Sequence, residues 1–163
     1  MGNTSSGSTY LYSSGTINGG SVSLGEGSGY TSFLELDIGG IITISGNITF
    51  NSANSYLYYL GTGTFNISGN FGANGTFLQG SSTVNFYGGG TSTVGSTVAD
   101  PYTFYNLTAT PGKTLTFTNS TTTTVSNALT LNGQSRRLSS YFKHVFVHLT
   151  QLFESGVVMI DGR

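Results

Sequence analysis

A short pattern that recurs at a fixed distance is the feature of this sequence that most constrains its fold. Residues 44–48 read ISGNI, and residues 67–71, which begin 23 positions later, read ISGNF. A third segment, VSNALTLN at 125–132, aligns with ISGNITFN at 44–51. Self-similarity at such a period is typical of solenoids, in which each repeat forms one coil and buries its apolar side against the next coil.

Short runs of alternating apolar and polar residues fill the first 133 residues. Such alternation predicts strands with one buried face, and none of these runs shows the helical period of 3.6. The 10 tyrosines, the 11 phenylalanines and the many threonines favour β-structure over disorder. We expect strands at 33–38, 41–50, 55–60, 63–68, 83–87, 102–108, 113–118 and 123–131.

The repeat predicts an all-β fold, a parallel β-helix or solenoid, over residues 1–133. With roughly 20–23 residues per coil, about six coils should stack into a rod of roughly 30 Å. Ile44, Ile48, Ile67 and Phe71 should point into the shared core, while Gly and Asn form tight or left-handed corners. Asn side chains at stacked corners can bond to Asn on adjacent coils. An antiparallel β-sandwich is the alternative, because it also joins many short strands by turns.

Residues 134–163 form a second zone of different composition. They hold six charged residues and both histidines, whereas residues 1–133 hold only five charges. Their apolar residues recur at spacings of three and four, which is typical of one helix face. We expect an amphipathic helix that caps the last coil, because an open end exposes apolar surface and strand edges. A helix that docks a partner, or an unrelated extension, is the alternative.

Composition excludes several classes of function. Charged residues make up 7% of the chain and the net charge is −1, so there is no electrostatic footprint for nucleic acid or an anionic membrane. No apolar run approaches the roughly 20 residues of a membrane span. The chain has no cysteine, which removes thiol chemistry and Cys-ligated zinc. The first residues lack a signal-peptide pattern, so a signal would have been removed or would lie on a longer parent.

Two pairs of side chains could carry chemistry by their spacing. Glu35 and Asp37 are two residues apart on one expected strand, so both should project from the same face, roughly 7 Å apart. That separation would suit sugar hydrolysis or calcium, but Leu34 and Leu36 should occupy the core side and leave the acids solvated. His144 and His148 have the spacing of two metal ligands on a helix, yet no third ligand is evident. We therefore predict no catalytic residue, metal site or cofactor.

Threonines form the remaining candidate surface. Thr114, Thr116 and Thr118, with the run 121–124, should present hydroxyl groups outward on a regular lattice. Such a lattice can bind ice or crystalline polysaccharide by shape. It is also what an uncharged strand surface needs to remain wetted.

The C-terminal part of the expected solenoid resembles a known repeat. Residues 102–108 read YTFYNLT, residues 111–118 read PGKTLTFT, and residues 121–133 read TTTTVSNALTLNG. These segments are similar to the repeats of large secreted adhesin-like β-solenoid proteins of prokaryotes, which commonly read F-x-N-L-T, G-K-T-x-T-F and T-T-T-V-x-x-x-L-T-L-x-G. The resemblance is close over these segments and looser over 40–100. It implies an exported surface region with a structural or adhesive role and transfers no catalytic residues.

The expected function is therefore that of a non-catalytic, extracellular structural or adhesive segment of a surface protein, stalk or filament. Its expected partners are further copies, neighbouring repeats of a longer parent, or cell-surface glycans. A carbohydrate- or ice-binding module that uses threonine-rich faces is the first alternative. A polysaccharide-degrading β-helix enzyme is the second.

Overall fold

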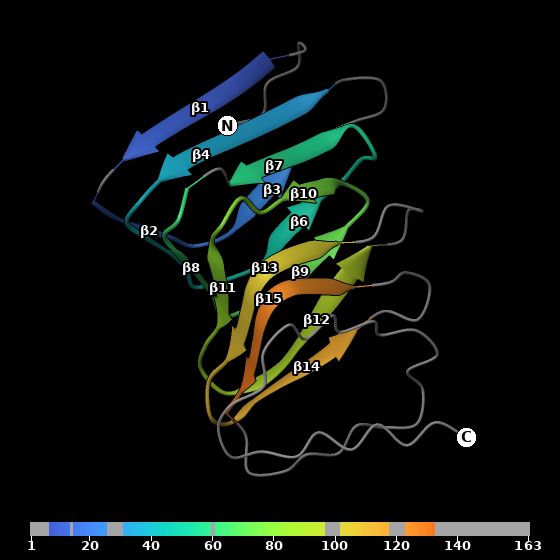
Figure 1. Ribbon diagram of the computed structural model, residues 1–163. Helices are drawn as coiled ribbons and strands as arrows, with labels where there is room; N and C mark the ends of the chain where they lie inside the picture. Colours follow the sequence, from blue (N-terminus) through green and yellow to red (C-terminus); the bar gives the residue numbers. More distant parts are fainter. Residues whose placement is uncertain are drawn as a thin grey trace.

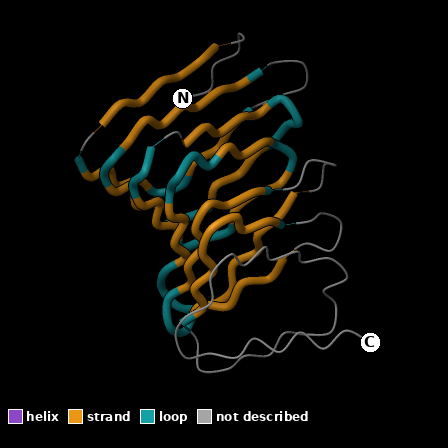
Figure 2. Tube along the Cα trace, viewed as in Figure 1, coloured by secondary structure: helices purple, strands orange, loops and turns teal. Residues whose placement is uncertain are grey.

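The chain is a parallel β-solenoid of about four turns (Figure 1). The computed structural model describes residues 7–13, 15–25, 31–59, 61–96, 102–117 and 123–132. In these ranges every paired strand runs parallel to its neighbour, and there is no helix (Figure 2). The all-β solenoid is thereby confirmed, since the alternative sandwich would require antiparallel pairs.

The strands form three parallel sheets that wrap around one core. Sheet A contains, in spatial order, β1 (Gly7–Ser13), β4 (Ser32–Ile38), β7 (Ser55–Tyr59) and β10 (Thr76–Leu78). Sheet B contains β2 (Thr16–Gly19), β5 (Ile41–Ile44), β8 (Thr64–Ile67), β11 (Thr83–Phe86), β13 (Thr103–Ala109) and β15 (Thr124–Leu131). Sheet C contains β3 (Val22–Leu24), β6 (Ile48–Phe50), β9 (Phe71–Ala73), β12 (Gly90–Ser96) and β14 (Lys113–Phe117).

Each turn visits sheets A, B and C in that order. The first four triplets, β1–β3 to β10–β12, form the four turns. After them β13 and β15 extend sheet B and β14 extends sheet C, while no described strand extends sheet A. The expectation of about six coils was therefore wrong. The count failed because the described strands after β12 extend only sheets B and C: β13 has seven residues and β15 has eight, and the two pair side by side through a β-bulge near Asn106.

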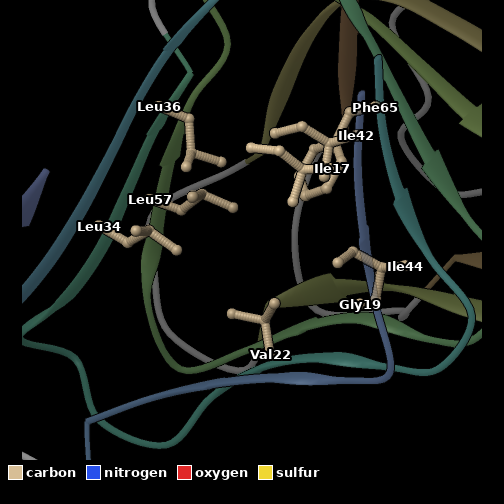
Figure 3. A pocket seen from close by; sticks show the side chains of 9 residues that line it. All are labelled: Ile17, Gly19, Val22, Leu34, Leu36, Ile42, Ile44, Leu57 and Phe65. Atoms are coloured by element: carbon tan, nitrogen blue, oxygen red, sulfur yellow. The ribbon is translucent and has the colours of Figure 1, made fainter. Parts of the chain in front are cut away.

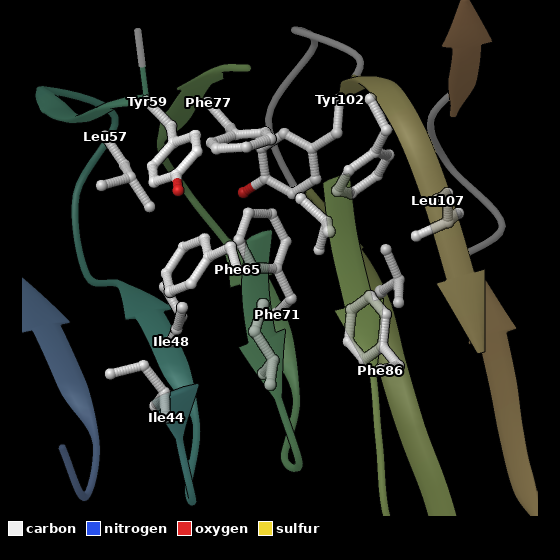
Figure 4. Close-up of a cluster of buried hydrophobic side chains, with 14 of the residues drawn as sticks. Ile44, Ile48, Leu57, Tyr59, Phe65, Phe71, Phe77, Phe86, Tyr102 and Leu107 are labelled. Carbon is white, nitrogen blue, oxygen red and sulfur yellow. The ribbon is translucent and has the colours of Figure 1, made fainter. Parts of the chain in front are cut away.

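The repeated segments lie directly above one another, as the 23-residue spacing predicted. Ile44 pairs in register with Ile67, and Ile48 pairs with Phe71. All four side chains are buried in the core and at most 4% exposed, and Figure 4 shows Ile44, Ile48 and Phe71 pointing into it. The spacing of the pattern is thus the length of one turn of the solenoid.

Residues 45–47 form the corner between sheets B and C, so the expected strand 41–50 is in fact β5 and β6. Neither Gly46 nor Gly69 has a positive φ, so the expected left-handed backbone is absent at these glycines. Glycine is needed there for close approach instead. A Cβ atom added at Gly69 would lie 2.5 Å from the Gly46 carbonyl oxygen and would also collide with Asn47 Oδ1.

The predicted bond between corner asparagines is present. The Asn70 N–H group donates to Asn47 Oδ1 at 2.8 Å, and the Thr93 N–H group donates to Asn70 Oδ1 at the same distance. The Asn47 N–H group donates in turn to Ser21 Oγ at 3.2 Å. The corner is therefore a hydrogen-bonded column that continues through four turns.

The third copy of the pattern does not lie where the sequence alignment placed it. Val125 pairs with Phe104, whereas Leu131 occupies the column that begins with Ile44 and Ile67. In this copy Asn127 stands where the first two copies have glycine. Here the pairing of β15 with β13 shifts register through a β-bulge between Val125 and Ala128, and the chain continues within the same strand.

Aromatic side chains fill the centre of the core (Figure 4). The ring of Phe71 lies 5.0 Å from that of Phe77, 5.5 Å from that of Tyr102 and 5.6 Å from that of Phe104, in edge or tilted contacts. Such geometries are the favourable ones for aromatic pairs.

The expected capping helix, the division at residue 133/134 and both histidines lie outside the described residues. Among the residues that are described, no helix is long and apolar enough to cross a membrane.

Candidate functional site

The outer faces of the three sheets differ in the chemistry that they offer to a ligand. Sheet A carries aromatic rings, sheet B carries amides and hydroxyls, and sheet C carries threonine hydroxyls. In the interior, burial shifts the pKa of two titratable groups, Tyr59 and Lys113.

On sheet A, the rings of Phe33, Tyr56 and Tyr58 form a half-buried cluster. Phe33 and Tyr56 are stacked with their centroids 4.8 Å apart and their planes 16° from parallel, and Tyr58 lies 5.8 Å from Phe33. The stacked rings of Phe33 and Tyr56 join β4 of the second turn to β7 of the third. The cluster therefore contributes to the contact between these turns.

The predicted pair Glu35 and Asp37 lies on β4, beside this cluster. Glu35 is half-exposed and in register with Tyr58, while Leu36 on the opposite face is buried, as expected. No group of three or more His, Cys, Asp or Glu residues that could hold a metal occurs in the described ranges. Glu35 therefore has an aromatic neighbour and no second carboxylate on the next turn, which gives no support to hydrolysis.

On sheet B, the polar side chains bond to one another. Asn85 Nδ2 donates to Asn66 Oδ1 at 2.7 Å, and Asn66 Nδ2 donates to Thr43 Oγ1 at 3.4 Å. Between β13 and β15, Asn127 Nδ2 likewise donates to Asn106 Oδ1 at 2.7 Å. These amides are engaged within the fold, so this face stabilises the stacking of turns and has few free groups for a ligand.

On sheet C, four threonines form a two-by-two lattice. Thr91 pairs in register with Thr114, and Thr93 pairs with Thr116. All four are exposed, and none of their hydroxyl groups has a hydrogen bond within the described part of the chain. Neighbouring strands lie about 4.8 Å apart and alternate residues roughly 7 Å apart. We call these four residues the threonine lattice; its hydroxyls are available to bind a ligand.

The sequence predicted half of this lattice. Thr114 and Thr116 project outward as expected, whereas Thr123, assigned to the same surface, is 5% exposed and lies in the interior. Thr91 and Thr93 were missed. The sequence does contain a pattern that predicts their position. GTSTV at 90–94 precedes KTLTF at 113–117 by 23 residues, the same spacing as in the glycine-containing repeat. Thr118, Thr121 and Thr122 lie outside the described residues.

Lys113 is a buried cation at the corner between sheets B and C. Only 8% of the residue is exposed, and its Nζ donates to the carbonyl oxygen of Ser68, two turns away, and to that of Gly89 at 3.4 Å. The same Ser68 carbonyl oxygen also accepts a hydrogen bond from Ser92 Oγ at 3.3 Å. Burial lowers the pKa of Lys113. The two hydrogen bonds of its Nζ join Lys113 to the two preceding turns of the solenoid.

Tyr59 is the other buried titratable group. Its ring stacks on that of Phe65 at 5.6 Å, and its hydroxyl group is buried without a hydrogen-bond partner among the described residues. Burial raises the pKa of Tyr59.

Comparison of the chain with protein-family models, with curated proteins and with solved structures finds no match. The surfaces described above therefore carry the functional inference by themselves.

Proposed function

We propose that the chain is a non-catalytic structural or adhesive segment of an extracellular or cell-surface protein, stalk or filament. The observation that supports this most strongly is the continuity of its interactions along the solenoid axis. The column that begins at Gly19 runs in register through Ile44, Ile67, Phe86 and Ala109 to Leu131. Each turn is thus joined to the next by backbone bonds, apolar packing and side-chain ladders at equivalent places, as a rigid rod requires.

The chemistry of the surface suits exposure to a variable medium. The ladders of sheets B and C consist of neutral amide and hydroxyl groups, such as Asn66 with Asn85 and Asn47 with Asn70. Neutral hydrogen bonds are insensitive to ionic strength and to moderate pH change, whereas surface ion pairs are screened by salt. A rod with these ladders would keep its structure where salt and pH are not controlled.

The resemblance of residues 102–133 to secreted adhesin-like repeats supports the proposed location. Protease shaving of intact source cells, followed by detection of peptides from this chain, tests it. Peptides released before lysis are the expected result. Peptides that appear only after lysis would contradict an extracellular role.

The threonine lattice favours one second function, a carbohydrate- or ice-binding module. Four free hydroxyls on a flat, uncharged surface can bond to the hydroxyls of a neutral polysaccharide. Pull-down on crystalline cellulose or chitin, together with a thermal-hysteresis assay, tests this function. Valine at all four positions should abolish any binding, while Thr130→Val, a matched exposed threonine on sheet B, should leave it unchanged. Equal retention of both variants would exclude the lattice.

A further inference from the structure

The C-terminal end of the solenoid exposes a side chain that belongs to the core. Leu131 occupies the inward column of Ile44, Ile67 and Phe86, and those three residues are at most 4% exposed. Leu131 itself is 47% exposed. No described strand pairs with β15 on the side away from β13, so within the described residues the core ends at this side chain.

The N-terminal end shows the complementary feature. The same column begins there with Gly19, which has no side chain. A cavity of about 180 Å³ lies beside it, lined by Ile17, Gly19 and Val22 of the first turn and by apolar residues of the second and third turns (Figure 3). A cavity of roughly 150 Å³ with such a lining accepts a benzene-sized apolar group, so this one has room for a leucine side chain.

The first strand of sheet B also has an open hydrogen-bonding edge. The carbonyl groups of Gly15 and Gly19 accept from Ile41 N–H at 3.3 Å and Ser45 N–H at 3.0 Å. Peptide groups alternate in direction along a strand, so those of Thr16 and Asn18 point away from β5. No described strand pairs with this side of β2.

The last strand of sheet B has the opposite edge open. The Asn132 N–H group donates to the Ala109 carbonyl at 3.0 Å, so Thr130 and Asn132 direct their peptide groups toward β13. The peptide groups of Leu129 and Leu131 then point away from it. Neither β2 nor β15 contains a charged residue, so the two edges can approach without electrostatic repulsion.

We propose that copies of this chain stack end to end, with β15 of one copy pairing in parallel with β2 of the next. Continuing the register of sheet B places Leu129 over Ile17 and Leu131 over Gly19 of the next copy. The Asn18 N–H group would donate to the Leu129 carbonyl, and the Leu131 N–H group to the Asn18 carbonyl, as Ser45 does to Gly19 within the chain. Leu131 then covers the apolar cavity at the N-terminal end.

A second copy fits these ends for reasons of geometry and charge. Both are edges of the same parallel sheet, so head-to-tail contact continues the ladder already formed by six strands. The contact is heterologous and does not close on itself, so it generates an open filament rather than a dimer. This inference rests on the proposed structural function and names the partner through which the rod would lengthen.

Sedimentation velocity of the full chain over a wide concentration range tests the stacking. The weight-average sedimentation coefficient should rise continuously with concentration, without a dimer plateau. Leu131→Asp should raise the concentration needed for association at least about tenfold, because the junction would bury an unpaired carboxylate. Leu78→Asp is the matched control, since Leu78 is 46% exposed, points outward and belongs to sheet A, whereas the copies would pair through sheet B; its association should equal that of the wild type.

Mixed variants give a second readout that misfolding alone does not reproduce. Asn18→Pro removes an N–H group at the open edge of β2 and none that bonds to β5. An equimolar mixture of Asn18→Pro and Leu131→Asp has one intact head and one intact tail, so it should stop at a 1:1 dimer. Circular dichroism establishes that each variant is folded.

Two results would overturn the stacking proposal. One is a full chain that stays monomeric at every concentration, which would mean that the end is covered by the chain's own later residues. The other is equal association of Leu131→Asp and Leu78→Asp. Either result leaves the extracellular role intact, because protease shaving tests that role independently.

Discussion

Replacing Gly69 with alanine should destabilise the solenoid by about 2–4 kcal/mol. The added Cβ would lie 2.5 Å from the Gly46 carbonyl oxygen and 2.6 Å from its carbon, both of them rigid backbone atoms. Relief requires the two turns to separate locally, and overpacking of this kind costs about 1–3 kcal/mol. The separation also weakens the 2.8 Å bond from Asn70 N–H to Asn47 Oδ1, which contributes about 0.5–1.5 kcal/mol.

Urea unfolding followed by far-ultraviolet circular dichroism measures this change, with the shift in midpoint compared at an unchanged slope. Gly39→Ala is the matched control, since an added Cβ at Gly39 meets no atom within 4 Å. It should be neutral or stabilising by up to about 1 kcal/mol, because alanine restricts the unfolded chain. A Gly69→Ala variant within about 0.5 kcal/mol of the wild type would refute the close stacking of turns at this corner.

Two further predictions concern buried titratable groups. The lowered pKa of Lys113 means that the unfolded chain binds more protons between that pKa and 10.5, so stability should rise with pH across this window. Lys113→Met should remove this rise in stability, which urea unfolding at several pH values measures. If the variant and the wild type show the same dependence of stability on pH, the burial of the Lys113 ammonium group is contradicted. The raised pKa of Tyr59 means that the folded chain binds more protons above pH 10.0, so stability should fall there. Tyr59→Phe should lessen this loss of stability at alkaline pH. It should also stabilise the protein by roughly 1 kcal/mol at neutral pH, because it removes a buried hydroxyl group that has no hydrogen-bond partner among the described residues. A destabilised variant would show that the hydroxyl group does make a hydrogen bond.

The fold class could be predicted because the repeat length equals the length of a turn. Ile44 and Ile67 each precede a Ser-Gly-Asn corner, and the two residues pair in register on adjacent turns. The distance between the two copies in the sequence is therefore the number of residues in one turn. The number of turns could not be predicted in this way. It depends on whether a segment bends at a corner, and at the third copy the chain forms a β-bulge within β15 instead of a corner between two sheets.

Several short strands were not predicted, including β2, β3 and β10. Each has only three or four residues, and TING in β2 contains one aliphatic residue, too few for a periodicity to be recognised. These strands exist because a neighbouring turn supplies their hydrogen bonds and apolar contacts. Tertiary context of this kind is absent from local sequence patterns.

In the threonine lattice, too, one part could be predicted from local sequence and the other part depends on the pairing of strands. The outward direction of Thr114 and Thr116 follows from strict alternation within one strand. Their neighbours Thr91 and Thr93 are set by the pairing of β12 with β14, which only the 23-residue register reveals. Thr123 lies in the interior because it stands two residues before the buried Val125, on the same face of the chain.

Disulfide cross-linking tests the stacking of equivalent segments most directly, since the chain has no cysteine of its own. Thr43 and Asn66 are partners on adjacent turns, whereas Thr43 and Asn85 are two turns, or roughly 9.6 Å, apart. A disulfide requires Cα atoms within about 7 Å. The double-cysteine variant at 43 and 66 should therefore cross-link rapidly within the monomer, and the variant at 43 and 85 should not. Failure of the first pair, or equal cross-linking of both, would contradict the solenoid.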